Sequence, residues 1–367
     1  LMLHEVGWDP QDLNVVEYPV TGMPNKNGTG FVDYVLWGDD GKPLGLVEAK
    51  RTSVDPHEGQ RQAELYANCL EQMHGQRPII FYTNGYETWI WDDQMYPERQ
   101  VQGLYSKQEL MRLIQRRRMR KYFQSVPTNK AIVDRAYQEE AIRSMCEHLS
   151  LGHRRGLLVM ATGTGKTRVA IALVDVLMRA GWVKRVLFLA DRTALVNQAY
   201  NAFKTHLPES SPVNLLDERE VTQGRVVLST YHTMMNLINI SDENNQKRYS
   251  VGHFDLVIID EAHRSVYNKF GAIFEYFDSL LLGLTATPKN EVDRNTYRLF
   301  NLPDGTPVMH YELDQAVADG YLTPFKAYSV PLKFQREGIR YRDLSDEEKA
   351  EWDQLDWSDE EPPEFID

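Results

Sequence analysis

The pattern of hydrophobic and polar positions changes along this chain of 367 residues, near residue 130. Before that point, short runs rich in β-branched and aromatic residues alternate with turn residues. Phe31–Trp37 and Leu44–Lys50 flank the turn Gly38–Pro43, which predicts a β-hairpin, and a second hairpin is predicted around Asn84-Gly85. Gly59–Gln72 lies between the hairpins and has the pattern of a helix. These elements predict a mixed β-sheet.

A further helix is predicted where the two patterns meet. Ser106 and Glu109 have the spacing of a capping box, and the helix that they open ends in the basic run Arg116–Lys121. Cations are favourable at a helix C-terminus, so this run fits a solvated helix end. The alternatives are a contact with phosphate groups or a joint between domains.

Beyond Tyr137, apolar strand-like runs alternate mostly with helical stretches, which is typical of a parallel sheet covered by helices on both faces. The predicted fold class is therefore α/β, with a mixed-sheet domain followed by a parallel-sheet domain. The predicted strands are Gly156–Met160, Val186–Ala190, Val226–Thr230, Leu256–Asp260 and Leu281–Thr285. The predicted organisation is a mixed-sheet domain at 1–103, a helical bridge at 104–129, a parallel-sheet domain at 130–325 and a connecting segment with an acidic tail at 326–367.

Composition narrows the class of protein. The formal net charge is −12, but residues 343–367 hold twelve acidic residues and one basic residue, so the rest of the chain is nearly neutral and can carry basic patches for phosphates. No apolar run approaches the ~20 residues of a membrane span, and the first ten residues lack the basic start of a secretory signal. The two cysteines, Cys69 and Cys146, lack the spacing of metal ligands. We expect a cytoplasmic protein.

A phosphate-binding loop is predicted after the strand Leu157–Met160. Its glycines let backbone N–H groups point at phosphate oxygens, and the helix that follows adds its positive N-terminal end. Lys166 is expected to reach the β- and γ-phosphates of ATP, and the Thr167 hydroxyl to bind Mg²⁺. The usual first glycine of such a loop is replaced here by Met160. The loop residues are Thr162, Gly163, Thr164, Gly165, Lys166 and Thr167.

Two carboxylates complete the predicted nucleotide site. The apolar strand Leu256–Ile259 runs into Asp260-Glu261-Ala262-His263, about 95 residues after the phosphate loop. The carboxyl end of that strand lies at the edge of the sheet that carries the loop. Asp260 is therefore expected to hold Mg²⁺, and Glu261 to orient and deprotonate the attacking water.

Further segments resemble the helicase superfamily-two motors. Thr285-Ala286-Thr287 resembles the motif that couples hydrolysis to movement, whereas Leu189–Arg192 and Ser229-Thr230-Tyr231 resemble motifs that grip a nucleic-acid backbone. Upstream, Tyr137 and Gln138 resemble the segment that reads adenine, with a ring to stack and an amide to pair with the base edge. Tyr137 taken alone is equally consistent with a core aromatic residue.

A second candidate site lies on the first predicted hairpin. If its loop is symmetric, paired positions sum to 81, so Asp33 faces Glu48, and Lys50 projects from the same face. Two opposed carboxylates repel, and a divalent cation with a nearby ammonium group compensates. Such a set can bind Mg²⁺, activate water and stabilise a pentacovalent phosphate. The alternative is an ordinary surface hairpin with a salt bridge.

This set resembles the PD-(D/E)xK nucleases, in which one acid precedes an acid-x-lysine pair on the next strand. Glu48-Ala49-Lys50 matches that pair, and Gln62 and Tyr66 match a Q-x-x-x-Y pattern on the helix that follows. The resemblance assigns Asp33 and Glu48 to the metal, and Lys50, Gln62 and Tyr66 to catalysis or its support.

A nuclease followed by such a motor resembles the R (restriction, HsdR-type) subunit of type I restriction enzymes. The resemblance implies ATP-driven translocation along double-stranded DNA and its cleavage, in complex with methyltransferase (M) and specificity (S) subunits. Family members continue into a second motor lobe that supplies arginine fingers, so we expect this chain to be a piece that binds ATP and turns it over slowly. A single-chain restriction enzyme with a fused methyltransferase and a non-catalytic nucleic-acid-binding scaffold are the alternatives. Type III subunits fit less well, because their nuclease follows the motor.

Overall fold

The computed structural model describes residues 2–12, 14–217, 224–262, 264–287 and 289–324, short stretches at 339–340 and 365–366, and residues 342, 345 and 349. For residues 264–268 only the backbone is described. The chain divides into two compact units, residues 1–322 and 323–367. The first unit thus contains the predicted mixed-sheet domain, the helical bridge and all but the last three residues of the predicted parallel-sheet domain. The predicted acidic tail lies mostly outside the described residues.

The N-terminal part of the first unit is a six-stranded mixed sheet in the order β1-β2-β3-β4-β5-β6. Neighbouring strands are antiparallel except β3 and β4, which are parallel and are connected through helix α2 (Gln60–His74). This confirms the predicted mixed sheet with two hairpins and a helix between them. The short helix α1 (Met2–Glu5) precedes the sheet. The strands are β1 (Val16–Thr21), β2 (Thr29–Trp37), β3 (Pro43–Ala49), β4 (Ile79–Thr83), β5 (Thr88–Trp91) and β6 (Arg99–Val101).

Helices cover both faces of this sheet, which explains why β3 is apolar at nearly every position. Leu46 packs in a cluster with Ala63 and Tyr66 of α2. Its neighbour Val47 packs with Leu110 of helix α3 (Lys107–Met119) on the opposite face. Successive side chains of a strand point to opposite faces, so a strand covered on both sides has no position for a polar residue unless that residue has a function.

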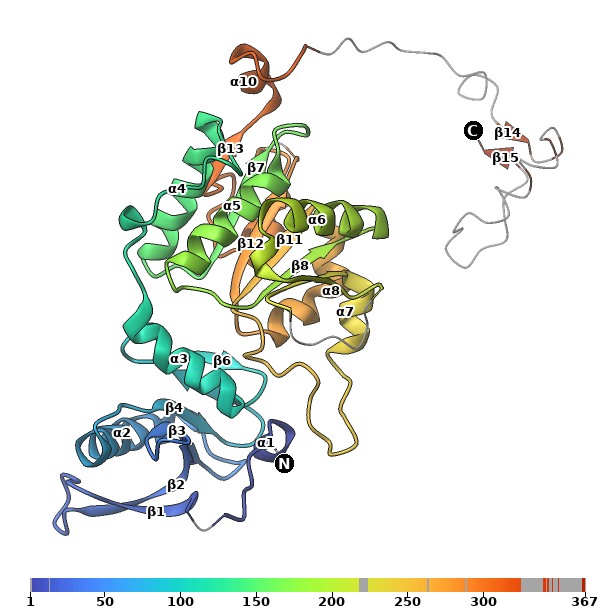
Figure 1. Ribbon diagram of the computed structural model, residues 1–367. Helices are drawn as coiled ribbons and strands as arrows, with labels where there is room; N and C mark the ends of the chain where they lie inside the picture. The colour runs from blue at the N-terminus through green and yellow to red at the C-terminus, as the bar shows by residue number, and fades with distance from the viewer. Residues whose placement is uncertain are drawn as a thin grey trace. The chain divides into compact units, whose positions relative to one another are not determined.

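Helix α3 lies between the mixed sheet and the second sheet (Figure 1). Its start is the predicted capping box: the Ser106 hydroxyl accepts from the Glu109 backbone N–H, and the Glu109 carboxylate accepts from the Ser106 N–H at 2.8 Å. The capping box is therefore confirmed, and α3 begins where the sequence predicted.

The second sheet has seven parallel strands in the order β13-β7-β12-β11-β8-β10-β9. The five predicted strands are all present, and the sheet gains short strands at its two edges, β9 and β13, that the sequence did not indicate. The strands are β7 (Arg155–Met160), β8 (Val186–Ala190), β9 (Pro212–Asn214), β10 (Val226–Thr230), β11 (Leu256–Asp260), β12 (Leu280–Thr285) and β13 (Met309–Tyr311).

One helix layer packs on each face of this sheet, as predicted (Figure 1). Alternate strand residues divide between the two cores: Leu158 and Ile258 face the first layer, whereas Leu157 and Val257 face the second. The α/β fold class is therefore confirmed. The first layer consists of α4 (Ala136–Ser150), α5 (Lys166–Arg179) and α6 (Thr193–His206), and the second of α7 (Tyr231–Leu237), α8 (Arg264–Tyr276) and α9 (Arg294–Leu299).

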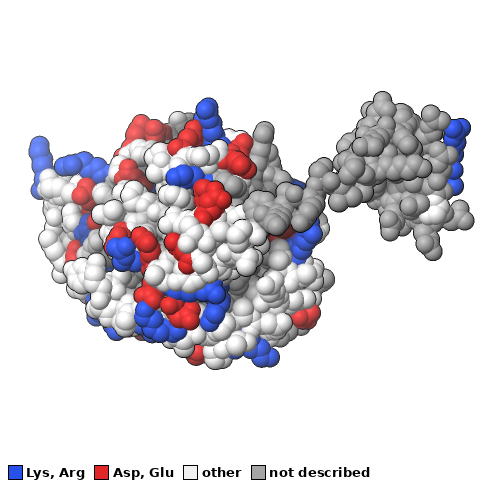
Figure 2. Space-filling view, turned by 90° about the horizontal axis from the view of Figure 1, so that it is seen from above, with Lys and Arg blue, Asp and Glu red and all other residues white. Residues whose placement is uncertain are grey.

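The remaining elements are small. Helix α10 (Leu313–Ala318) follows β13 in the first unit, and β14 (Ile339–Arg340) pairs with β15 (Phe365–Ile366) in the second. On the face of the first unit seen in Figure 2, acidic and basic side chains are interspersed, as expected for a body of nearly neutral charge. Within the described residues, every helix is too short or too polar to serve as a membrane span.

Candidate functional site

The first hairpin has the register that the symmetric turn predicted. Tyr34 pairs with Val47 and Val35 with Leu46, so paired positions sum to 81, and a bulge at Leu36/Trp37 absorbs the irregular end of the turn. Continued by one residue, this register would set Asp33 opposite Glu48. The backbone N–H of Ala49 donates to Asp33 Oδ2 at 2.7 Å, which holds the Asp33 carboxylate against the strand that carries Glu48.

A chain of hydrogen bonds joins the other predicted residues of this site. Lys50 Nζ donates to Glu48 Oε1 at 2.8 Å and to Gln62 Oε1 at 2.9 Å. Gln62 Nε2 in turn donates to the Tyr66 hydroxyl at 2.8 Å. The structure therefore brings Glu48, Lys50, Gln62 and Tyr66 together, although Gln62 and Tyr66 come from α2 and the other two from the end of β3.

The Glu48 carboxylate is electrostatically unusual. Only 2% of Glu48 is exposed. Burial raises the pKa of Glu48 and the charge of Asp33 raises it further, while the hydrogen bond from Lys50 opposes the rise. Among the described residues, Glu48 Oε2 finds no hydrogen-bond partner. A buried carboxylate oxygen without a protein donor, beside a second carboxylate, fits a divalent cation.

Only two carboxylates converge at this point. Across the part of the chain that the structure describes, no three His, Cys, Asp or Glu side chains gather as a metal-binding group. A cation held by Asp33 and Glu48 would complete its coordination with water or with phosphate oxygens of a substrate, which is the usual preference of Mg²⁺.

Two glycines allow this packing, and sequence reasoning did not single them out. A Cβ at Gly59 would lie 3.2 Å from Glu48 Cγ and 3.1 Å from Lys50 Cε, and a Cβ at Gly30 would lie 2.8 Å from Tyr66 Cε1. A side chain at Gly30 would displace Tyr66, and one at Gly59 would press on Glu48 and Lys50, because helix α2 and the hairpin approach closely.

The second candidate site lies at the carboxyl ends of the parallel strands. The loop after β7 has glycines at positive φ, 87° at Gly163 and 85° at Gly165, so it adopts a backbone that other residues rarely accept. Helix α5 begins directly after it, at Lys166. Thr167 therefore sits in the first turn of α5, and Thr162 and Gly163 are exposed. This is the predicted strand, loop and helix arrangement for binding phosphate.

The acids of this second site come from β11. Lys166 Nζ lies 3.9 Å from Glu261 Oε1 and 3.4 Å from the Met160 carbonyl oxygen. Burial raises the pKa of Asp260 to about 6, with a further contribution from Glu261, and Lys166 opposes the rise. Glu261 has a φ of 55°, a strained value of the kind that clusters at functional sites. The structure thus places the predicted acids beside the loop lysine; His263 lies outside the described residues.

Tyr137 and Gln138 contact the phosphate loop itself. The Tyr137 hydroxyl and Gln138 Nε2 each donate to the Thr164 carbonyl oxygen at 2.9 Å. The Tyr137 ring is stacked on Tyr311, with centroids 4.0 Å apart, and is only 5% exposed. This favours a core aromatic residue that anchors the loop over a ring free to stack on adenine. Gln138 Oε1 has no partner among the described residues, and adenine contact by Gln138 stays a prediction.

The Ser229-Thr230-Tyr231 motif lies mostly in the protein interior. Ser229 and Tyr231 are almost fully buried, at 0% and 1% exposure. The Tyr231 hydroxyl donates to the Asp260 carbonyl oxygen at 2.7 Å, and Thr230 caps α7 through the Thr233 N–H. The side chains of Ser229 and Tyr231 are therefore not exposed to a nucleic acid, and contact of this motif with a nucleic-acid backbone stays a prediction. Tyr231 supports the strand end that carries Asp260, a role that the sequence motif did not indicate.

Fold and sites together define a protein with a paired-carboxylate site on a mixed sheet and a phosphate-loop site on a parallel sheet. Comparison with known families agrees with this division. Residues 13–99 match the family "Type I restriction enzyme R protein N terminus", and residues 131–290 match "Type III restriction enzyme, res subunit".

Among curated proteins, the chain is 32% identical to the type I restriction enzyme EcoAI endonuclease subunit of Escherichia coli, over 84% of this chain and 39% of that protein. It is 27% identical to the EcoKI endonuclease subunit of E. coli K12, over 84% of this chain and 31% of that protein. A solved fragment described as an HsdR subunit from Vibrio vulnificus shares 26% identity over 87% of this chain and 58% of that one, with a TM-score of 0.41.

The chain belongs to the HsdR-type family of type I restriction enzyme R proteins. It spans between three and four tenths of the length of the two E. coli subunits. Its second domain is of the helicase-like res type.

Proposed function

We propose that this chain supplies the endonuclease site and the first part of the ATP-driven translocase of a type I restriction enzyme. The substrate would be cytoplasmic double-stranded DNA, and the partners M and S subunits. The observation that supports this is the presence of both constellations, Glu48–Lys50–Gln62 and Lys166–Glu261, within one compact unit.

At the mixed sheet, Asp33 and Glu48 would hold Mg²⁺, which supplies Lewis-acid chemistry on a phosphodiester. Lys50 would stabilise negative charge on the scissile phosphate, and its hydrogen bonds to Glu48 and Gln62 support a place beside the metal. Gln62 fixes Lys50 by accepting one of its N–H groups, and Tyr66 in turn accepts from the Gln62 amide. These two residues would therefore position Lys50 for catalysis.

At the parallel sheet, the loop from Thr162 to Thr167 would hold the phosphates of ATP, and Thr167 and Asp260 its Mg²⁺. Lys166 would balance negative charge on the β- and γ-phosphates, and Glu261 would orient and deprotonate the attacking water. The 3.9 Å separation of Lys166 Nζ and Glu261 Oε1 supports a shared role of the two groups at one γ-phosphate.

The test uses the full-length protein that contains this chain, assembled with its M and S subunits. Glu48→Gln should abolish double-strand cleavage and leave ATP hydrolysis unchanged, whereas Lys166→Ala should abolish both. Glu64→Gln, on the same helix as Gln62, is the matched control and should retain both activities. Cleavage of both strands by the Glu48→Gln enzyme would refute the nuclease assignment.

A further inference from the structure

The arginine-rich end of α3 faces two sheets at once. Toward the mixed sheet, Arg117 donates to Asp92 Oδ1 at 2.9 Å and to the Arg77 carbonyl oxygen at 2.6 Å. Toward the parallel sheet, Arg112 donates to the Gly252 carbonyl oxygen at 2.8 Å. Of the alternatives that the sequence left open for this basic run, the structure favours a joint between domains.

Asp255, which precedes β11, binds another arginine of α3, Arg116. Arg116 forms an ion pair with Asp255 Oδ1, while the backbone N–H groups of Lys184 and Arg185 donate to Oδ2 at 2.7 and 2.9 Å. Burial would raise the pKa of Asp255, but the neighbouring guanidinium groups and these N–H donors outweigh it and leave the pKa below its ordinary value. The carboxylate is therefore ionised and fully engaged at the joint.

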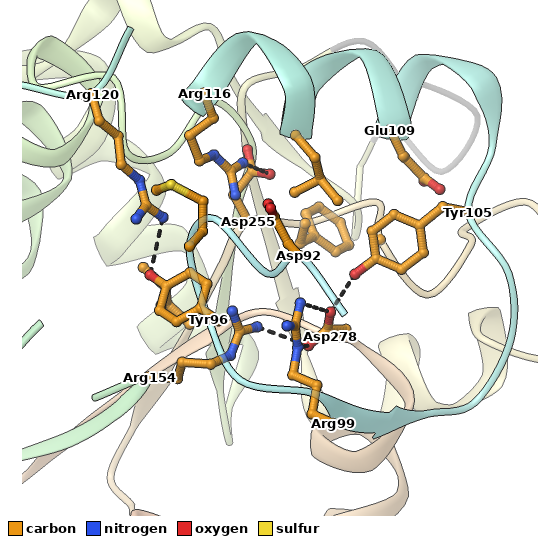
Figure 3. A pocket seen from close by; sticks show the side chains of 15 residues that line it. Asp92, Tyr96, Arg99, Tyr105, Glu109, Arg116, Arg120, Arg154, Asp255 and Asp278 are labelled. Carbon is orange, nitrogen blue, oxygen red and sulfur yellow. Dashed lines mark hydrogen bonds and ion pairs between the residues drawn. The ribbon is translucent and has the colours of Figure 1, made fainter. Parts of the chain in front are cut away.

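Asp278 is the centre of a second cluster (Figure 3). Arg99, from β6 of the mixed sheet, donates to its two carboxylate oxygens at 2.7 and 2.6 Å, and Arg154 donates at 2.8 Å. The Tyr105 hydroxyl also donates to Asp278. The Tyr105 ring lies directly over Gly252, where any Cβ would come within 2.4 Å of it. The contact is thus both ionic and closely packed.

These contacts lie at the opposite ends of the strands that carry the nucleotide site. Arg154 immediately precedes β7, Asp255 immediately precedes β11, and Asp278 is two residues before β12. The carboxyl ends of the same strands carry the phosphate loop, Asp260 and Thr285. At roughly 3.3 Å per residue, five- or six-residue strands separate joint and site by about 16–20 Å of hydrogen-bonded sheet.

We propose that this joint fixes the mixed sheet to the base of the parallel sheet as one rigid body, so that the nuclease site moves with the motor lobe. The joint consists of Asp278 with Arg99, Arg154 and Tyr105, and Asp255 with Arg116. The rigid coupling is a property of the chain alone. Its consequence, that nucleotide-driven motion of the lobe carries the nuclease along, rests on the proposed function.

The rigid body is tested by a distance measurement between two spin labels. Tyr86 on the mixed sheet and Leu151 after α4 are 84% and 78% exposed, so Tyr86→Cys and Leu151→Cys accept labels, while the native cysteines are buried. Double electron–electron resonance should give one narrow distance, unchanged by a non-hydrolysable ATP analogue with Mg²⁺. Asp278→Asn should broaden it. A broad distribution with the joint intact, or a narrow one in Asp278→Asn, would overturn the proposal.

Two further variants complete the design. Asp304→Asn removes the partner of an exposed pair with Arg294 and should leave the distance narrow. Arg99→Gln perturbs the joint from the other sheet and should broaden the distance as Asp278→Asn does; circular dichroism checks that each variant is folded.

The functional consequence is tested in the full-length enzyme. Asp278→Asn should retain DNA-stimulated ATP hydrolysis but lose cleavage by about 2- to 30-fold, the range typical of coupling residues. Undiminished cleavage would show that the joint does not carry the coupling. If the full-length enzyme without substitutions neither cleaved DNA nor hydrolysed ATP, the proposed function would be refuted. The spin-label result would still test the rigid joint.

Discussion

Tyr137→Phe separates two roles that a tyrosine can have beside a nucleotide. The substitution removes only the hydroxyl, which donates to the Thr164 carbonyl oxygen at 2.9 Å and accepts from Arg135 Nη1 at 3.0 Å. A phenylalanine ring keeps the stack on Tyr311. If the hydroxyl anchors the phosphate loop, the variant binds nucleotide more weakly. If the ring alone matters, by stacking on adenine, the variant is silent.

The expected magnitude follows from the loss of one of the two hydrogen bonds that the Thr164 carbonyl oxygen accepts. Gln138 Nε2 still holds the Thr164 carbonyl in the variant, so the loop loses part of its order and keeps its shape. A neutral hydrogen bond contributes about 0.5–1.5 kcal/mol net. Part of the binding free energy must then order the loop, and a loss of this size corresponds to about 2- to 10-fold weaker affinity.

The assay is calorimetric titration with Mg²⁺-ATP and, separately, with Mg²⁺ and inorganic tripolyphosphate. Because the loop is proposed to bind the phosphates and not the base, both ligands should bind more weakly by the same factor. Tyr18→Phe is the control, since the Tyr18 hydroxyl contacts His74 of α2, far along the chain from the phosphate loop, and it should change neither affinity. Unchanged binding by Tyr137→Phe, or a loss confined to ATP, would refute the loop-anchor assignment.

Three further outcomes are expected. Gln62→Ala and Tyr66→Phe should lower cleavage by about 10- to 100-fold without abolishing it, because these residues support Lys50; loss as complete as in Glu48→Gln would contradict this. Burial and nearby guanidinium groups lower the pKa of His253 to about 3. Between pH 6.5 and about 3 only the unfolded chain takes up a proton at His253, so the free energy of unfolding decreases as the pH is lowered. His253→Gln should remove about 1.4 kcal/mol of that loss per pH unit in denaturant titrations, and an unchanged slope would contradict it. Gly283→Ala should lower stability by about 1–3 kcal/mol, because its Cβ would lie 2.3 Å from Phe300 Cζ; an unchanged melting temperature would contradict it.

Local patterns were enough to predict most of the fold. A two-stranded hairpin has a register set by its turn, so the pairing of Tyr34 with Val47 followed from counting outward from the loop. Apolar runs bounded by glycine and polar residues located the five central strands of the parallel sheet. The edge strands β9 and β13 were not predicted, because each has only three residues and such a short run shows no periodicity.

The contacts between domains could not be predicted in the same way. Arg99 and Asp278 are 179 positions apart, and neither lies in a recognisable motif. The basic run at the end of α3 was visible, but a surface arginine and a buried one look alike in sequence. The partner that distinguishes them, Asp255, lies some 140 positions away. The burial of Tyr231 against the Asp260 carbonyl oxygen could not be predicted for the same reason, because it depends on strands that meet only in the folded sheet.

Glu48 and Asp260, one acid from each candidate site, share a property that ordinary surface acids lack. Glu48 and Asp260 each lie at or next to the carboxyl end of a buried strand, and burial raises the pKa of both. A carboxyl group with a raised pKa favours folding at low pH, and this contribution is lost as pH rises through the folded-state value, about 6 for Asp260. At neutral pH the ionised Asp260 therefore lowers the stability of the folded chain. Natural sequences break packing rules in this way mainly at functional sites. A divalent cation favours the ionised form, so the residues that destabilise the free protein are the ones best suited to bind it.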